Sequence, residues 1–303
     1  MIQRKDFIFF EEENCFRIIN SKVNSINMRK FINKYNLSHI AIVTDKPRCL
    51  YLDLSETKLK SIIIRSKKSD FNIKCTNCTA LESFSSDADM IIENDAFKGC
   101  SSLKTFDIKK INIFAKQTYI GNSAFVECSS LESIDIPSID IIGPNAFRNC
   151  TSLKYVNIQK CEEICAGAFS GCTSLIKFDF SNVSKINDKV TCIDTGFNKI
   201  IDERYYIEGA FSGCTSLKDI IIGSQLYYIG EYTFEGCISL KKVYIRMDAT
   251  HEEVYDDTVH YVNGANFHDN TFPKGTLIYS VYGEIKKLDM IRLRYKLHWI
   301  LFI

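Results

Sequence analysis

Proline and glycine are scarce in this sequence, which has 4 prolines and 14 glycines among 303 residues. Their scarcity excludes collagen-like chains and proline-rich linkers. Long apolar runs are also missing, since none approaches the roughly 18–20 residues that a membrane-spanning helix requires. The sequence therefore predicts no membrane span.

An excess of charge of either sign is absent too. Lys and Arg number 38 and Asp and Glu 37, so the formal net charge is +1. This balance argues against a nucleic-acid partner and against an acidic disordered tail. With 46% hydrophobic and 12% aromatic residues, the chain can offset the entropy lost on folding. Its length fits either two compact domains or one elongated repeat protein.

Catalytic motifs are lacking as well. No glycine-rich phosphate loop follows a strand-like segment, and no His-Glu-x-x-His motif occurs. With only 5 histidines, Cys–His nucleophilic catalysis has few candidate bases. The sequence therefore predicts neither an enzyme nor a bound cofactor.

What the chain does have is an internal repeat, in which a small residue and Phe are followed by x-x-Cys-x-x-Leu. Each Leu then opens a Leu-x-x-φ-x-φ phrase, where φ is apolar. Successive leucines lie 22 residues apart from Leu131 to Leu175, and the same spacing runs back from Leu103 to Leu37. The six clear copies begin at Ala96, Ala124, Ala146, Ala168, Ala210 and Thr233.

A period of about 22 residues predicts an α/β solenoid with one short parallel strand per turn. In this interpretation the Ala-Phe-x-x-Cys segments form short helical turns on the other side of the coil. Asp95, Ser123, Asn145 and Gly167 would cap these helical turns. The six phenylalanines of the repeat would stack into a column inside the coil.

The predicted organisation has three parts. Residues 1–36 form an N-terminal cap, in which residues 28–35 are helical. Residues 37–245 form the solenoid, with degenerate copies at 37–77 and 181–205; a worn copy at 197–201 brings the count to ten strand phrases. Residues 246–303 hold a polar insert, a closing half-repeat that starts at Phe272, and a capping helix at 284–299.

The sequence from Ile142 to Ile158, Ile-Gly-Pro-Asn-Ala-Phe-Arg-Asn-Cys-Thr-Ser-Leu-Lys-Tyr-Val-Asn-Ile, resembles the BspA-type leucine-rich repeat. Ile120-Gly121 and Ile229-Gly230 supply the same Ile-Gly lead. The resemblance implies a right-handed leucine-rich-repeat coil that serves as a binding or adhesion surface, in a family found in bacteria and abundant in parasitic protists. The sequence departs from the family pattern in two ways. The signal and wall-attachment segments that many bacterial members carry are missing, and the proline that usually follows the strand occurs only once, as Pro137.

The 13 cysteines are interpreted as small buried fillers with free thiols. No secretory signal leads the chain, so a disulfide framework is not favoured. A redox or zinc role for Cys75-x-x-Cys78 lacks a second pair at metal spacing. A cytoplasmic location is favoured, and unconventional display at the cell surface stays open. Seven cysteines share one repeat offset: Cys78, Cys100, Cys128, Cys150, Cys172, Cys214 and Cys237.

The candidate binding residues lie at outward positions of four adjacent strand phrases, on the expected concave face. Aligned strands would bring several carboxylates together, and stacked like charges are unfavourable. The sequence therefore predicts a strip that binds a basic or hydroxyl-bearing partner, although a solvated face screened by Lys104 and Lys154 would show the same pattern. The strip comprises Thr105, Asp107, Ser133, Asp135, Tyr155, Asn157, Lys177 and Asp179.

Three functional hypotheses remain. The favoured one is a non-catalytic leucine-rich-repeat binding protein, whose partner is a protein or a cell-surface ligand. The second is a structural or degenerate repeat protein without a dedicated ligand. The third is a metal-dependent enzyme in the polar insert, which holds His251, Glu252, Glu253, Asp256, Asp257 and His260.

Overall fold

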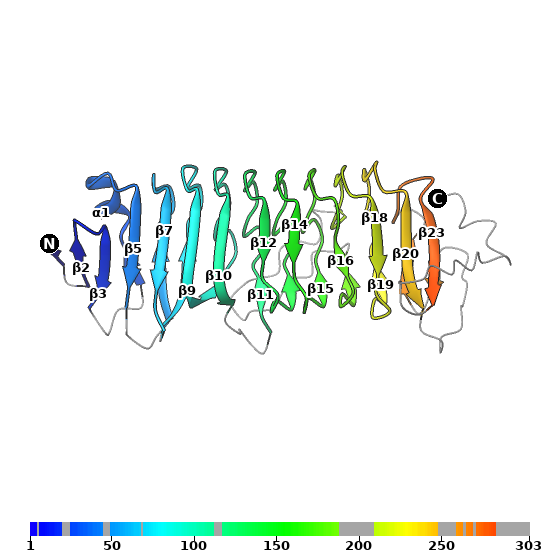
Figure 1. Cartoon of the computed structure of the whole chain (residues 1–303), viewed down its shortest axis with the longest axis horizontal. Coiled ribbons are helices and arrows are strands. Elements are labelled where there is room, and N and C mark those ends of the chain that lie inside the picture. The colour runs from blue at the N-terminus through cyan, green and yellow to red at the C-terminus, as the bar shows by residue number, and fades with distance from the viewer. Residues whose placement is uncertain are drawn as a thin grey trace.

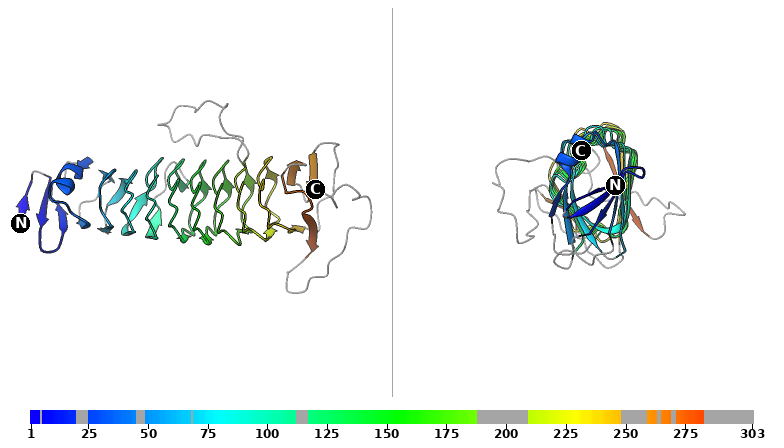
Figure 2. Two further views of the ribbon diagram at one scale, coloured as in Figure 1. Left: turned by 90° about the horizontal axis from the view of Figure 1, so that it is seen from above. Right: turned by 90° about the vertical axis from the view of Figure 1, so that its left-hand side faces the viewer.

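The computed structural model describes most of the chain up to residue 282. The described ranges are 1–4, 6–19, 25–44, 49–67, 69–111, 117–187, 209–247, 259–262, 265–268 and 271–282. The molecule is an elongated β-solenoid whose turns are stacked along a nearly straight axis (Figure 1). Seen along that axis, successive turns superimpose (Figure 2). The main sheet is therefore flat, and the expectation of a concave face is wrong.

Each leucine opens a strand of the main sheet, as predicted. Nine such strands pair in parallel along most of the coil, and a tenth, β23, closes the series. We call their outer surface the strand face. The strands are β5 (His39–Val43), β7 (Ser61–Arg65), β9 (Ser83–Ile91), β10 (Thr105–Ile111), β12 (Ser133–Asp135), β14 (Tyr155–Asn157), β16 (Asp179–Phe180), β18 (Asp219–Ile222), β20 (Lys242–Met247) and β23 (Leu277–Tyr282).

A second series of short parallel strands forms the opposite side, so the expectation of one strand per turn is wrong. β11, β13 and β19 are the Ile-Gly leads of the repeat, whereas the isoleucines of β15 and β17 are followed by Cys165 and Asn187. A side chain at Gly121 would lie 2.3 Å from the backbone of Glu93, so glycine suits the close approach of the turns at this position. The series is β6 (Cys49–Asp53), β8 (Asp70–Lys74), β11 (Tyr119–Ile120), β13 (Ile141–Ile142), β15 (Glu163–Ile164), β17 (Lys185–Ile186) and β19 (Tyr228–Ile229).

The expected helical turns do not form. Cys100 N–H donates to the Phe97 carbonyl at 3.1 Å, but Phe97 N–H donates to Ala124 of the next turn at 2.7 Å. Alternate amides thus bond between turns, which a helix does not allow. Asp95 and its equivalents are not caps, because they adopt left-handed backbone conformations. Their φ values are 57° at Asp95, 56° at Ser123, 56° at Asn145 and 66° at Gly167.

The degenerate copy expected at 181–205 is not a turn of its own. β16 pairs directly with β18, and Asp179 lies opposite Ile221. Phe169 likewise stacks directly on Phe211, with 5.2 Å between ring centroids, so no turn fits between them. Residues 181–187 complete the turn that Leu175 opens, and the worn copy at 197–201 lies outside the described residues. The leucine-led strands therefore number nine up to β20, not ten.

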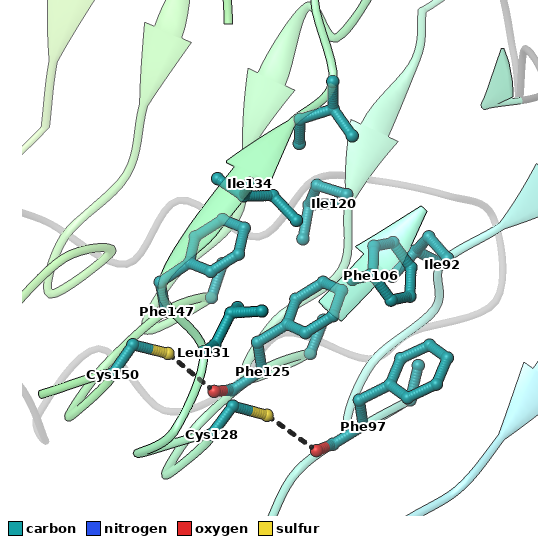
Figure 3. Close-up of a cluster of buried hydrophobic side chains, with 14 of the residues drawn as sticks. Ile92, Phe97, Phe106, Ile120, Phe125, Cys128, Leu131, Ile134, Phe147 and Cys150 are labelled. Atoms are coloured by element: carbon teal, nitrogen blue, oxygen red, sulfur yellow. Dashed lines mark hydrogen bonds between the residues drawn. The ribbon is translucent and has the colours of Figure 1, made fainter. Parts of the chain in front are cut away.

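The predicted phenylalanine column is confirmed. Its rings stack nearly parallel at 5.0–5.5 Å and are fully buried (Figure 3). Phe272 extends the column, 5.3 Å from Phe234, and so takes the phenylalanine position of a further turn. The apolar residues of the strands, such as Leu131 and Ile134, pack beside the rings.

The two ends differ in construction. At the first end β1 (Ile2–Gln3), β2 (Phe7–Phe10) and β3 (Cys15–Ile18) are antiparallel, and β3 then pairs in parallel with β5. β4 (Ser25–Asn27) pairs with β6, and α1 (Arg29–Lys34) confirms the expected helix. These elements fit a cap over the first turn.

At the other end the antiparallel hairpin of β21 (Val259–Val262) and β22 (Ala265–His268) joins β19. The expected helix at 284–299 lies outside the described residues. Among the residues that the structure describes, no helix has the length and apolarity needed to cross a membrane.

Candidate partner-binding surface

Seven of the predicted site residues lie on the strands of the strand face, and Lys177 lies just before β16. The structure brings four of them together on β12 and β14, where Ser133 pairs with Tyr155 and Asp135 with Asn157. Thr105 and Asp107 lie on β10, which pairs with β9. The described pairing of the main sheet breaks between β10 and β12 and again between β14 and β16, so the eight residues are not one continuous strip.

In the described pairings no aspartate of this row lies opposite another, since Asp107 lies opposite Ser85, Asp135 opposite Asn157 and Asp179 opposite Ile221. Asn157 donates a hydrogen bond from Nδ2 to Asp135 Oδ1 at 2.7 Å. Asp179 Oδ1 accepts from the backbone N–H and hydroxyl of Ser181, at 2.9 and 2.5 Å. These neutral donors stabilise the carboxylates and separate them along the row.

The two lysines expected to screen the aspartates pair instead with a row of glutamates. Lys104 Nζ lies 3.7 Å from Glu82, and Lys154 Nζ lies 3.2 Å from Glu132. These pairs run along the edge of the sheet where the strands begin. The lysines therefore neutralise the glutamates of the preceding turns rather than the aspartates.

A slot of about 200 Å³ opens on the strand face between β14 and β16. No backbone hydrogen bond joins these two strands in the described part of the chain. Three of the predicted residues, Tyr155, Asn157 and Asp179, line it. The other lining residues are Val156, Ile158, Gln159, Cys161, Ser181, Asn182 and Val183.

The core residues differ between the turns on the two sides of the slot. Inward positions of β14 hold small or branched aliphatic residues such as Val156, whereas the next turn carries Phe178 and Phe180. Phe178 packs 4.7 Å from Phe211 of the following turn, and Phe180 packs 5.2 Å from the same ring. β16 pairs with β18 and not with β14 in the described part of the chain.

Sequence reasoning missed Gln159, Ser181 and Asn182, which follow the strands rather than lie in them. Asn182 Nδ2 donates to the Gln159 carbonyl across the slot. The sequence signal that could have located them is the change from Val156 to Phe178 at equivalent positions of adjacent turns. Core residues of unequal size weaken the regular stacking of turns.

The repeat cysteines form a structural ladder. Each thiol from Cys128 to Cys237 donates to the carbonyl of the phenylalanine one turn earlier, as in Cys128 to Phe97 at 3.2 Å (Figure 3). Burial raises the pKa of the Cys128 and Cys172 thiols to about 12. The 12 cysteines of the described residues are free of disulfides, and Cys75 and Cys78 are both buried. The thiols from Cys128 to Cys237 are buried and shielded from solvent.

The described residues contain no group of three His, Cys, Asp or Glu side chains that could hold a metal ion. The insert residues His251, Glu252, Glu253, Asp256 and Asp257 lie outside the described residues. His260 lies on β21, but its side chain is not described. The third hypothesis, a metal-dependent enzyme in the insert, is therefore not tested by the described residues.

Comparison with known families identifies the repeat. The model of the BspA type leucine rich repeat region matches in six copies over residues 5–114, 104–195 and 204–256. The chain belongs to this family. The match covers the six clear copies and reaches the degenerate turns near the N-terminus, and the resemblance predicted from the sequence is confirmed.

Solved structures of other leucine-rich-repeat proteins are similar at low identity. A leucine rich cell surface protein from Faecalibacterium prausnitzii is 16% identical over 80% of this chain and 94% of that chain, with a TM-score of 0.35. A leucine-rich repeat protein from Bacteroides ovatus is 17% identical over 93% and 99%, with a TM-score of 0.33. The pneumococcal vaccine antigen PcpA is 13% identical over 80% and 74%, with a TM-score of 0.39. A search of curated proteins gave no match.

Proposed function

We propose that this BspA-type repeat protein is a non-catalytic binding protein, and that its partner is another protein held against the strand face. The recognition chemistry is the same for a partner displayed at a cell surface and for a partner free in solution. The observation that carries the proposal is the slot beside β14, where an aromatic ring and several polar side chains converge.

Tyr155 at this slot is 57% exposed, although the strand could carry a polar residue there at no cost to the core. Exposed tyrosines beside polar groups are frequent anchors in protein interfaces. Asp135 and Asn157 hold each other in place next to it. A surface that is ordered before binding loses less entropy when a partner docks.

The alternative of a purely structural repeat gives no reason for an exposed tyrosine and several polar side chains to converge on one slot. The enzyme alternative finds no support in the described residues, because the buried thiols already serve the backbone and the slot contains no histidine.

Site-specific photocrosslinking tests the proposal. A photoreactive amino acid at Ser133, on the strand face, should capture a discrete protein in native cells. The same group at Glu235, on the turn edge, should not. Adding Tyr155→Ala should abolish the capture from Ser133. Equal capture at both positions, or capture unaffected by Tyr155→Ala, would overturn the proposal.

A further inference from the structure

We propose that the slot between β14 and β16 receives a single lysine or arginine side chain of the protein partner. This inference rests on the proposed function and specifies the chemistry of its central contact. It commits to a cationic side chain on a protein, and a saccharide ligand is an alternative that the test below separates.

The shape of the slot suits a long side chain with an aliphatic stem. Val156, Ile158 and Val183 supply its apolar walls, and its volume is about 200 Å³. Lysine and arginine bury their methylene groups against apolar surface while the charged end reaches polar groups.

The carboxylate of Asp179, which would bind the cation, is already held in one rotamer before a ligand arrives. Ser181 holds Asp179 Oδ1 through its backbone N–H and its hydroxyl, which sets the carboxylate rotamer. Oδ2 has no partner among the described residues. A charge-assisted hydrogen bond to a guanidinium or ammonium group would therefore form without reorganising the carboxylate.

The neighbouring groups favour the same ligand. The exposed ring of Tyr155 can contact a cation through its face. Asn157 donates from Nδ2 to Asp135, so its carbonyl oxygen is the atom left to accept. Lys177 lies two residues before Asp179 on the same face, but it does not line the slot and forms no ion pair with Asp179 among the described contacts. With no cation among the lining residues, the slot does not suit an anionic ligand.

The test uses two small probes that differ in charge alone. Nα-acetyl-arginine amide and its uncharged isostere Nα-acetyl-citrulline amide are titrated into the whole protein. Binding is followed by NMR through the side-chain amide signals of Asn157 and Asn182. The arginine probe should bind in the millimolar range, as expected for one side chain, and at least tenfold more tightly than the citrulline probe.

Two isosteric variants locate the site. Asp179→Asn should weaken binding of the arginine probe at least tenfold, because it removes the charge and keeps the shape. Asp107→Asn, on the strand face but outside the slot, should change binding less than twofold. Equal affinity for both probes, no effect of Asp179→Asn, or equal effects of the two variants would overturn the inference. Methyl hexosides that shift the same signals while the arginine probe does not would also overturn it.

Failure of this inference is distinguishable from failure of the proposed function. If crosslinking at Ser133 still captures a protein through Tyr155 while neither probe binds, the strand face recognises its partner without a cationic side chain in the slot. If the arginine probe binds but no protein is captured, the proposed function fails and the slot remains a cation-selective site.

Discussion

The thiol of Cys150 donates a hydrogen bond to the backbone carbonyl of Phe125, one turn earlier, at 3.1 Å (Figure 3). The same carbonyl also accepts from the backbone N–H of Cys128 at 3.1 Å. One oxygen thus joins two turns of the coil. This explains why the repeat carries cysteine, because alanine would fill most of the space and provide no donor.

Replacing Cys150 by Ala should lower the free energy of unfolding by about 1–3 kcal/mol, from a lost hydrogen bond and a small cavity. Cys150→Ser retains a donor and should cost less than Cys150→Ala. Urea denaturation followed by circular dichroism measures both. Cys49→Ala, at an exposed thiol, is the control and should change stability by no more than about 0.5 kcal/mol. Equal effects at Cys150 and Cys49 would contradict the ladder.

The buried thiols should make the protein sensitive to alkali. The ordinary pKa of 9.0 applies when the chain is unfolded, and burial raises the pKa of Cys128 and Cys172 to about 12. A group whose pKa is raised on folding makes its full contribution to stability below its pKa in the unfolded chain. For these thiols that contribution is therefore lost as pH rises from 9 towards 12. Each thiol then removes about 1.4 kcal/mol per pH unit.

Urea unfolding at pH 8, 9 and 10 measures this dependence. The double variant Cys128→Ala with Cys172→Ala is the comparison, because it removes two of the titrating thiols and leaves tyrosines and lysines unchanged. Its stability should fall less steeply above pH 9 than that of the natural sequence. Identical slopes would show that the two thiols titrate normally in the folded chain.

Phe147 lies between two rings of the column, 5.0 Å from Phe125 and 5.2 Å from Phe169. Phe147→Ala should cost about 3–5 kcal/mol, as truncation of a buried phenylalanine does. Differential scanning calorimetry would register the loss as a lower melting temperature. Tyr227→Ala removes a ring of similar size at a half-exposed position and should have a much smaller effect. A similar shift for both would argue against the column.

Glu127 adopts a left-handed conformation, with φ of 62°, at a position where other turns carry Gly99 or Gly171. Glu127→Gly should therefore stabilise the chain by about 0.5–1 kcal/mol, because glycine adopts this conformation without steric cost. Glu235→Gly, one position earlier in its own turn and without a positive φ, should destabilise. Thermal denaturation measures the melting temperatures of the two variants. Destabilisation by both substitutions would contradict the expected gain at Glu127.

The phenylalanine column and the register of the strand phrases were predictable because both follow from spacing. Leu131, Phe147 and Cys150 recur at fixed offsets, so equivalent residues must stack once the turns superimpose. The helical turns were wrongly predicted, since Ala-Phe-x-x-Cys has helical spacing and the sequence does not show where alternate amides bond. Left-handed residues such as Ser123 and Glu127 give no sign of their conformation by residue type.

The binding surface was predictable only in part. Outward positions such as Tyr155 and Asp179 follow from the alternation of a strand. The slot does not, because it depends on which neighbouring strands pair, and the sequence does not show that β16 pairs with β18 but not with β14. The spacing between Leu175 and Leu217 was also misleading, since 42 residues suggested two turns where the structure has one.

The double role of the phenylalanine carbonyls has a mechanical consequence. Each turn is hydrogen-bonded to the turn before it and the turn after it. A pulling force on the last strand would therefore act on the hydrogen bonds between one pair of turns at a time. The coil would then peel from that end in steps of one turn, each about 22 residues of released chain, rather than rupture in a single event.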